Sequence, residues 1–145
     1  MSTTRFAGLN LVSSNMENTI AFYRLLGVDI PADILWESDS GIHHVELPIE
    51  GGEAGIDLDS QQLAASYNAG WHKSQNPCVI GFSVETRDAV DEHHDKLSAA
   101  GYTSLQPPYD AFWGARYAII EDPDGNPVGI MSPRDPAHQN PPPSL

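Results

Sequence analysis

Four side chains that can exchange protons or bind metals occur in two short segments. In both segments polar and apolar residues alternate, as is typical of β-strands. His44 and Glu46 lie in IHHVEL, and Asp57 and Asp59 lie in IDLDS. Because side chains along a strand alternate between its two faces, each pair points to one side. A histidine beside carboxylates can titrate near neutral pH and serve as an acid–base group. The same donor types can also ligate a divalent metal.

The apolar residues at the alternate positions of both segments indicate where this polar face lies. They are expected to pack against helices, so the polar face points into a cavity. Three interpretations of it stay open. His44 can form an acid–base pair with Glu46 or Asp57, the four residues His44, Glu46, Asp57 and Asp59 can hold a metal, or the face is a hydrated acidic surface without a metal.

The elements that hold these side chains follow an order that occurs twice: a strand, a helix, then two or three strands. The first half has a strand at Phe6–Ser13, a helix at Met16–Leu26 and extended segments at 34–38, 42–49 and 54–60. The second half has a strand at 78–85, a helix from a Thr86 cap to about Ala100, and strands at 104–110, 116–122 and 127–132. Turn-like residues lie at 50–53 and 122–126. A repeat of about 55 residues indicates two similar modules packed together.

The repeat predicts a single domain over residues 1–132. Its modules span about 5–60 and 78–132, and a connector at 61–77 can hold a short helix at Gln61–Tyr67. Residues 133–145, PRDPAHQNPPPSL, are rich in proline and polar side chains. We expect this tail to be disordered.

Three segments occur in the order NMENTIAFYRLLGV, GFSVETRDAVDEHHDKLSAAGY and FWGARYAIIEDPDGNPVGIM. Together they resemble the glyoxalase/bleomycin resistance/dioxygenase superfamily, also called the vicinal oxygen chelate superfamily. The resemblance implies an α+β fold of two paired βαβββ modules, whose strands form an open, U-shaped sheet around a cup with helices outside. It also implies a homodimer, by analogy alone.

The metal-dependent enzymes of that family place His, Glu or Gln ligands on up to four strands facing the cup. The positions that match here are Gly8, Asp57, Val79 and Gly129, with Asn10 and Met131 close by. Only Asp57 offers a carboxylate, and one carboxylate does not hold a catalytic metal. The resemblance therefore implies that the usual metal centre is missing, and we expect no metal and no cofactor.

Charge and aromatic residues suggest what the cup binds instead. The formal net charge is −13, and no Lys or Arg occurs between Gly27 and His72. Aromatic faces beside carboxylates suit a flat, cationic guest. Arg116 can hold a ligand carboxylate or pair with a nearby acid. The predicted ligand-binding residues are Asn10, Trp36, His44, Glu46, Asp57, Asp59, Tyr109, Phe112, Trp113, Arg116 and Met131.

The net charge, the N-terminal segment and the cysteine count limit which partners and which cellular location we expect. A strongly acidic chain is a poor partner for nucleic acid or an anionic membrane. There is no apolar signal-like N-terminus and only one cysteine, which favours the cytoplasm. The leading hypothesis is a metal-independent small-molecule-binding protein, similar to the antibiotic-sequestering members of the family. The alternative is a glyoxalase- or dioxygenase-like lyase or isomerase. It would use an atypical metal site or metal-free acid–base catalysis by His44, Glu46 and Asp57.

Overall fold

The computed structural model describes residues 3–48, 54–71, 78–121 and 126–145. Its strands are β1 (Arg5–Ser13), β2 (Trp36–Ser38), β3 (Gly41–Glu46), β4 (Gly55–Ser60), β5 (Cys78–Ser83), β6 (Ser104–Asp110), β7 (Arg116–Glu121) and β8 (Pro127–Met131). Its helices are α1 (Met16–Leu26), α2 (Gln61–Tyr67) and α3 (Arg87–Ala99), with single 3₁₀ turns at Ala32–Ile34 and Pro136–His138. The predicted turn at 50–53, most of the turn at 122–126 and connector residues 72–77 lie outside the described residues.

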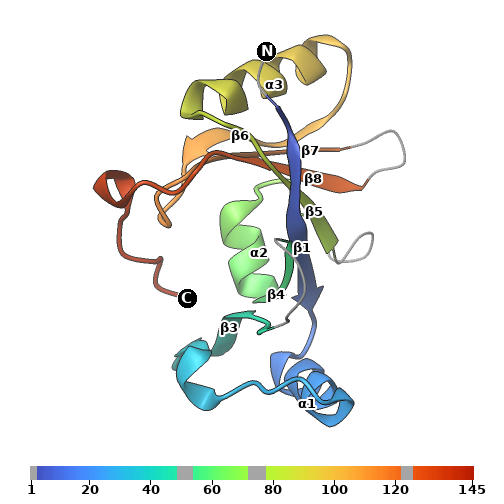
Figure 1. The fold of residues 1–145 in the computed structure, drawn as a ribbon, viewed down its shortest axis with the longest axis vertical. Coiled ribbons are helices and arrows are strands. Elements are labelled where there is room, and N and C mark those ends of the chain that lie inside the picture. The colour runs from blue at the N-terminus through green and yellow to red at the C-terminus, as the bar shows by residue number, and fades with distance from the viewer. Residues whose placement is uncertain (1–2, 49–53, 72–77, 122–125) are drawn as a thin grey trace.

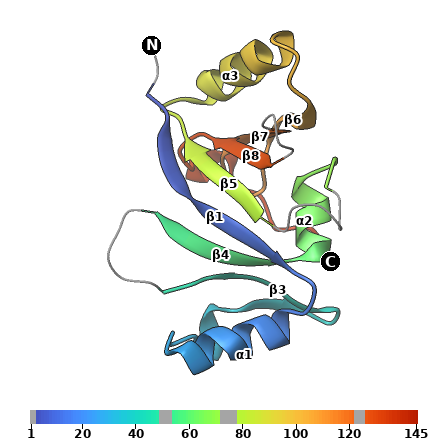
Figure 2. The ribbon, with the colours of Figure 1, turned by 90° about the vertical axis from the view of Figure 1, so that its right-hand side faces the viewer.

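All eight strands form one open mixed sheet in the order β2-β3-β4-β1-β5-β8-β7-β6. β1 pairs in parallel with β4 and antiparallel with β5, and β5 pairs in parallel with β8. The order on one side of the β1–β5 junction therefore mirrors the order on the other side. This arrangement confirms the predicted α+β fold, with its repeated strand order and open sheet (Figures 1 and 2).

The two module helices cover the outer face of the sheet, at opposite ends of the molecule (Figure 1). Asn15 caps α1 by accepting from the Asn18 amide, and Thr86 caps α3 by accepting from the Ala89 amide. Beneath α1, one apolar core contains Ile20, Val45, Leu47 and Leu58, and beneath α3 a second contains Val90 and Ile120. The apolar faces of β3 and β4 thus pack as the alternation predicts.

One helix differs from the expected arrangement. The third helix, α2, lies on the concave face of the sheet instead of outside. Its residues Leu63, Ala64 and Tyr67 belong to the core that lines the cup. In the described ranges, no helix has the length and apolar character needed to cross a membrane.

The tail was predicted to be disordered, and the structure differs. The Asp135 amide donates to the Gly114 carbonyl at 3.0 Å, and the Asn140 amide donates to the Phe112 carbonyl at 2.8 Å. Leu145 packs against the cup-lining core, and the Ser38 hydroxyl donates to its backbone oxygen at 2.8 Å. Composition alone missed these contacts because prolines need few backbone partners and the polar groups find theirs on the cup rim.

Gly8 lies where the backbone of β1 packs closely against that of β4. Its φ is +148°, and an added Cβ would lie 2.4 Å from the Gly55 carbonyl oxygen. We expect Gly8→Ala to lower the free energy of unfolding by about 3 kcal/mol, because side-chain overlap and an unfavourable φ add together.

Urea denaturation of the purified variant measures this loss. Gly55→Ala is the matched control, since a Cβ there meets no atom within 4 Å. Its change in unfolding free energy should stay below about 1 kcal/mol. Equal losses in both variants would contradict the close packing of β1 on β4.

Candidate ligand-binding cup

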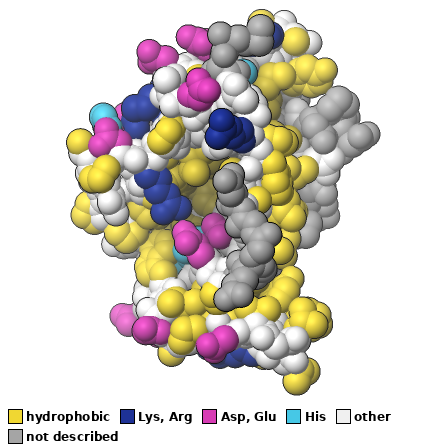
Figure 3. Space-filling view, viewed as in Figure 1, with side chains coloured by type: hydrophobic (Ala, Val, Ile, Leu, Met, Phe, Trp, Pro, Cys, Tyr) yellow, Lys and Arg dark blue, Asp and Glu magenta, His cyan; other side chains and the backbone are white. Residues whose placement is uncertain are grey.

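The concave face of the sheet encloses a cavity of about 300 Å³. Figure 3 shows it as a hollow floored by hydrophobic side chains, with acidic and basic side chains near its rim. The lining residues are Asn10, Trp36, His44, Glu46, Asp57, Asp59, Leu63, Tyr67, Phe112, Trp113, Tyr117, Met131 and Arg134. They come from both modules, from α2 and from the tail, so the whole fold is needed to form the cavity.

Most of the predicted ligand-binding residues lie at this cavity, but Tyr109 and Arg116 do not line it. The Tyr109 hydroxyl donates to the Tyr67 carbonyl at 3.3 Å, and its ring packs against the cup-lining core. Arg116 forms ion pairs with Asp91 at 2.9 Å and with Asp110 at 3.2 Å. Of the two roles expected for Arg116, the structure shows the pairing with nearby acids.

Four lining residues were missed from the sequence: Leu63, Tyr67, Tyr117 and Arg134. Tyr117 pairs with Met131 across β7 and β8, so strand alternation would have placed it on the same face. Leu63 and Tyr67 depend on α2 packing inside the cup, and Arg134 depends on an ordered tail. No local pattern signals those two arrangements.

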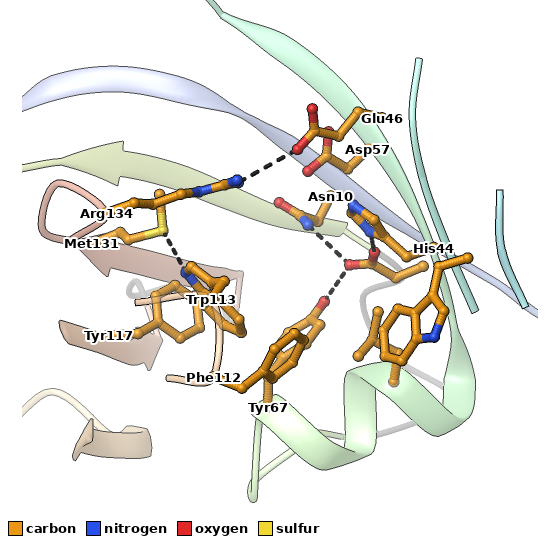
Figure 4. Close-up of a pocket in the computed structure, with 13 residues that line it drawn as sticks. Asn10, His44, Glu46, Asp57, Tyr67, Phe112, Trp113, Tyr117, Met131 and Arg134 are labelled. Atoms are coloured by element: carbon orange, nitrogen blue, oxygen red, sulfur yellow. Dashed lines mark hydrogen bonds and ion pairs between the residues drawn. The ribbon is translucent and has the colours of Figure 1, made fainter. Parts of the chain in front are cut away.

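Asp59 is the centre of the polar network (Figure 4). It is 1% exposed and accepts hydrogen bonds from His44 Nδ1 at 2.6 Å, Asn10 Nδ2 at 2.9 Å and the Tyr67 hydroxyl at 2.9 Å. The contact with this carboxylate favours the tautomer of His44 that carries its proton on Nδ1. Nε2 is then the ring nitrogen without a hydrogen bond to the described part of the chain. The expected partners of His44 were Glu46 and Asp57, and the structure pairs it with Asp59 instead.

The charges around His44 raise its pKa. Burial alone would lower it, but the hydrogen bond to Asp59 and the charges of Asp59, Asp57 and Glu46 outweigh burial. The imidazole therefore takes up positive charge more readily than a free histidine. It partly balances the acidic wall on which it lies.

Glu46 and Asp57 form the rest of that wall. They are direct cross-strand partners in β3 and β4. Burial, together with the charges of Asp59 and Glu46, raises the pKa of Asp57 to about 6, against the opposing effect of His44 and Arg134. Arg134 reaches Glu46 Oε1 at 3.4 Å, and both side chains are largely exposed. The wall thus has more acidic groups than nearby bases.

Aromatic rings form the opposite wall. Phe112 lies edge-on to Trp36 and Trp113, with ring centroids 5.9 and 5.1 Å away. Trp113 lies 5.2 Å from Tyr117, and its indole nitrogen donates to Met131 Sδ at 3.2 Å. These contacts fix the ring orientations and leave an apolar surface facing the carboxylates (Figure 4).

The four positions expected to match the family's metal ligands all lie on the central strands β4, β1, β5 and β8. Gly8, Val79 and Gly129 offer no side-chain donor at these positions. The Tyr117 hydroxyl lies over Gly129, only 2.8 Å from where a Cβ would be. The bulk lost at Gly129 is therefore taken up by Tyr117 and does not enlarge the cavity.

Comparison with known proteins agrees with this fold. A sequence model of the Glyoxalase/Bleomycin resistance protein/Dioxygenase superfamily matches residues 5–130. Because the match covers most of the chain, the protein belongs to this superfamily. No curated protein matches the sequence significantly.

Several solved structures share the fold at low identity. The NAD-dependent benzaldehyde dehydrogenase structure from Legionella pneumophila is 19% identical, with a TM-score of 0.59, over 90% of this chain and 98% of that one. A superfamily member from Vibrio splendidus is 12% identical, with a TM-score of 0.58, and the match covers 90% of this chain and 100% of that chain. An extradiol ring-cleaving dioxygenase from B. fuscum is 18% identical, with a TM-score of 0.59, and the match covers 94% of this chain and 37% of that chain. At such identities the likeness extends to the fold alone.

Asp57 should make stability depend on pH. Its pKa of about 6 lies above the ordinary value of 3.8, so folding favours the protonated form. The stability that protonated Asp57 contributes to the folded state is fully present below about pH 4 and is lost as the pH rises through 6. Asp57→Asn should therefore stabilise the protein at pH 7.5 by about 1–2 kcal/mol, and this gain should vanish at pH 4.

Thermal unfolding at both pH values, in the presence of a chelator, measures the difference. The control is Glu37→Gln, an exposed acid on β2. It should change stability equally little at both pH values. A loss of stability in Asp57→Asn at pH 7.5 would contradict the proposed burial cost.

Proposed function

We propose that the cup binds a flat organic cation without altering it. The observation that carries the proposal is the opposition of two walls across one cavity. Glu46, Asp57 and Asp59 come from β3 and β4, and Trp36 lies beside them as the cross-strand partner of His44. Phe112, Trp113 and Tyr117, from the second module, line the opposite side. A planar cation can stack on the rings while its charge faces the carboxylates.

The energetics favour such a ligand. Each cation–π contact contributes roughly 0.5–2 kcal/mol, and more when the charge is removed from water. The cavity of about 300 Å³ lies at the lower end of the range that holds small organic molecules. A net charge of −13 also attracts cations from a distance at low salt. Stoichiometric capture, as in the antibiotic-sequestering members of the superfamily, needs nothing further.

A second candidate function is acid–base catalysis, favoured by the contact between Asp59 and His44. A buried carboxylate that holds a histidine by Nδ1 leaves Nε2 available to take a proton from a bound molecule. In that case Asp59 orients the imidazole, and Asp57 or Glu46 stabilises its charged form. His44→Ala would then abolish turnover while leaving ligand affinity nearly unchanged.

Fluorescence titration with proflavine, a planar tricyclic cation, tests the binding proposal. Wild-type protein should bind one equivalent, and 0.5 M salt should weaken the binding. Glu46→Gln and Asp57→Asn should each weaken it at least about fivefold, since each removes roughly 1 kcal/mol of attraction.

Two controls separate cup binding from general attraction to an acidic surface. Glu37→Gln, outside the cavity, should leave the affinity unchanged. Acridone, a neutral molecule of similar shape, should bind more weakly than proflavine. If Glu37→Gln weakened proflavine binding as much as Asp57→Asn does, the cup would not be the binding site.

A further inference from the structure

The side chains of His44, Glu46 and Asp57 bring three potential metal ligands together on β3 and β4. One donor atom from each lies within 4.8 Å of the other two, and no other such group of three occurs in the described ranges. Glu46 and Asp57 are cross-strand partners, so the sheet itself holds them side by side. Figure 4 shows both carboxylates at the same edge of the cavity, next to His44.

Asp59 prepares His44 for metal binding without being a ligand. Its carboxylate already accepts hydrogen bonds from His44, Asn10 and Tyr67, at 2.6 to 2.9 Å. The bond to Nδ1 fixes the tautomer and leaves the Nε2 lone pair for a ligand. A carboxylate behind a metal-binding histidine is a common outer-shell arrangement, and it increases the basicity of the imidazole.

We infer that His44, Glu46 and Asp57 form a site for a divalent transition-metal ion, displaced from the family's usual metal position. One imidazole and two carboxylates suit Zn²⁺ or Co²⁺ better than Ca²⁺ or Mg²⁺, which prefer oxygen ligands alone. The usual position lacks donors and is partly filled by Tyr117, which lies over Gly129. The displaced set keeps Asp57 and replaces the missing ligands with residues from β3.

Arg134 is the group that the ion must displace. Its guanidinium lies 3.4 Å from Glu46, and the two side chains are 59% and 61% exposed. Such an exposed ion pair contributes little and opens easily. Glu46 is then free to bind an ion together with His44 and Asp57, since one donor atom of each residue already lies within 4.8 Å of the other two.

This inference does not rest on the proposed organic ligand. A metal and a planar cation would compete for Glu46 and Asp57, whereas the aromatic wall serves only the organic cation. The two can therefore fail separately: metal binding is measured without dye, and dye binding is measured with a chelator present.

Calorimetric titration with Zn²⁺ and visible absorption with Co²⁺ test the site. Tag-free protein should bind one equivalent of each ion in 0.3 M NaCl at pH 7.5. His44→Ala and Asp57→Asn should weaken binding by at least about tenfold. Arg134→Gln should strengthen it, because Glu46 then has no competing partner. His138→Ala, an exposed histidine outside the cavity, should bind as the wild type does.

Asp59→Asn separates positioning from simple structural support. It should weaken Zn²⁺ binding and also change the ¹⁵N NMR shifts of His44, because the Nδ1–H tautomer is no longer favoured. Far-UV circular dichroism of every variant checks that the fold is kept. The inference is overturned if wild-type protein shows no one-equivalent binding. It is also overturned if folded His44→Ala and Asp57→Asn variants bind as tightly as the wild type.

Discussion

The carboxylate of Asp59 is the interaction on which the cup depends. A buried charge is costly unless hydrogen bonds compensate it, and Asp59 has three donors from three different elements. His44 comes from β3, Asn10 from β1 and Tyr67 from α2. Satisfying one carboxylate therefore fixes the side chains of three cavity walls at once. The same contact sets the tautomer of His44, and with it the chemistry that the cup can perform.

Much of the fold was predictable because its signals are local. Alternation in β3 and β4 placed Val45 and Leu58 in the core and His44, Glu46, Asp57 and Asp59 in the cavity. The cap at Thr86 marked the start of the second module's helix. The order of the motifs then identified the superfamily, which the sequence match confirms. Period and capping are properties of short stretches, so they can be read without knowing the tertiary structure.

The parts that were missed depend on contacts between distant segments. The direction in which α2 packs is decided by the cup that its apolar residues fill, and a short connector does not reveal it. The tail is ordered by hydrogen bonds to Phe112 and Gly114, which composition does not show. Arg116 was placed in the cup by its type, but Asp91 and Asp110 hold it outside.

The cavity takes its walls from both ends of the chain: Asn10 belongs to the first strand and Arg134 follows the last. Strand β1 lies at the centre of the sheet and pairs with β5. Its backbone pairing on that side cannot form until β5 has been synthesised. Such non-local pairing slows folding. During synthesis on the ribosome, the nascent chain would therefore display its sheet edges before it has a pocket. The ability to bind a ligand would then arise in one late step and would not accumulate module by module.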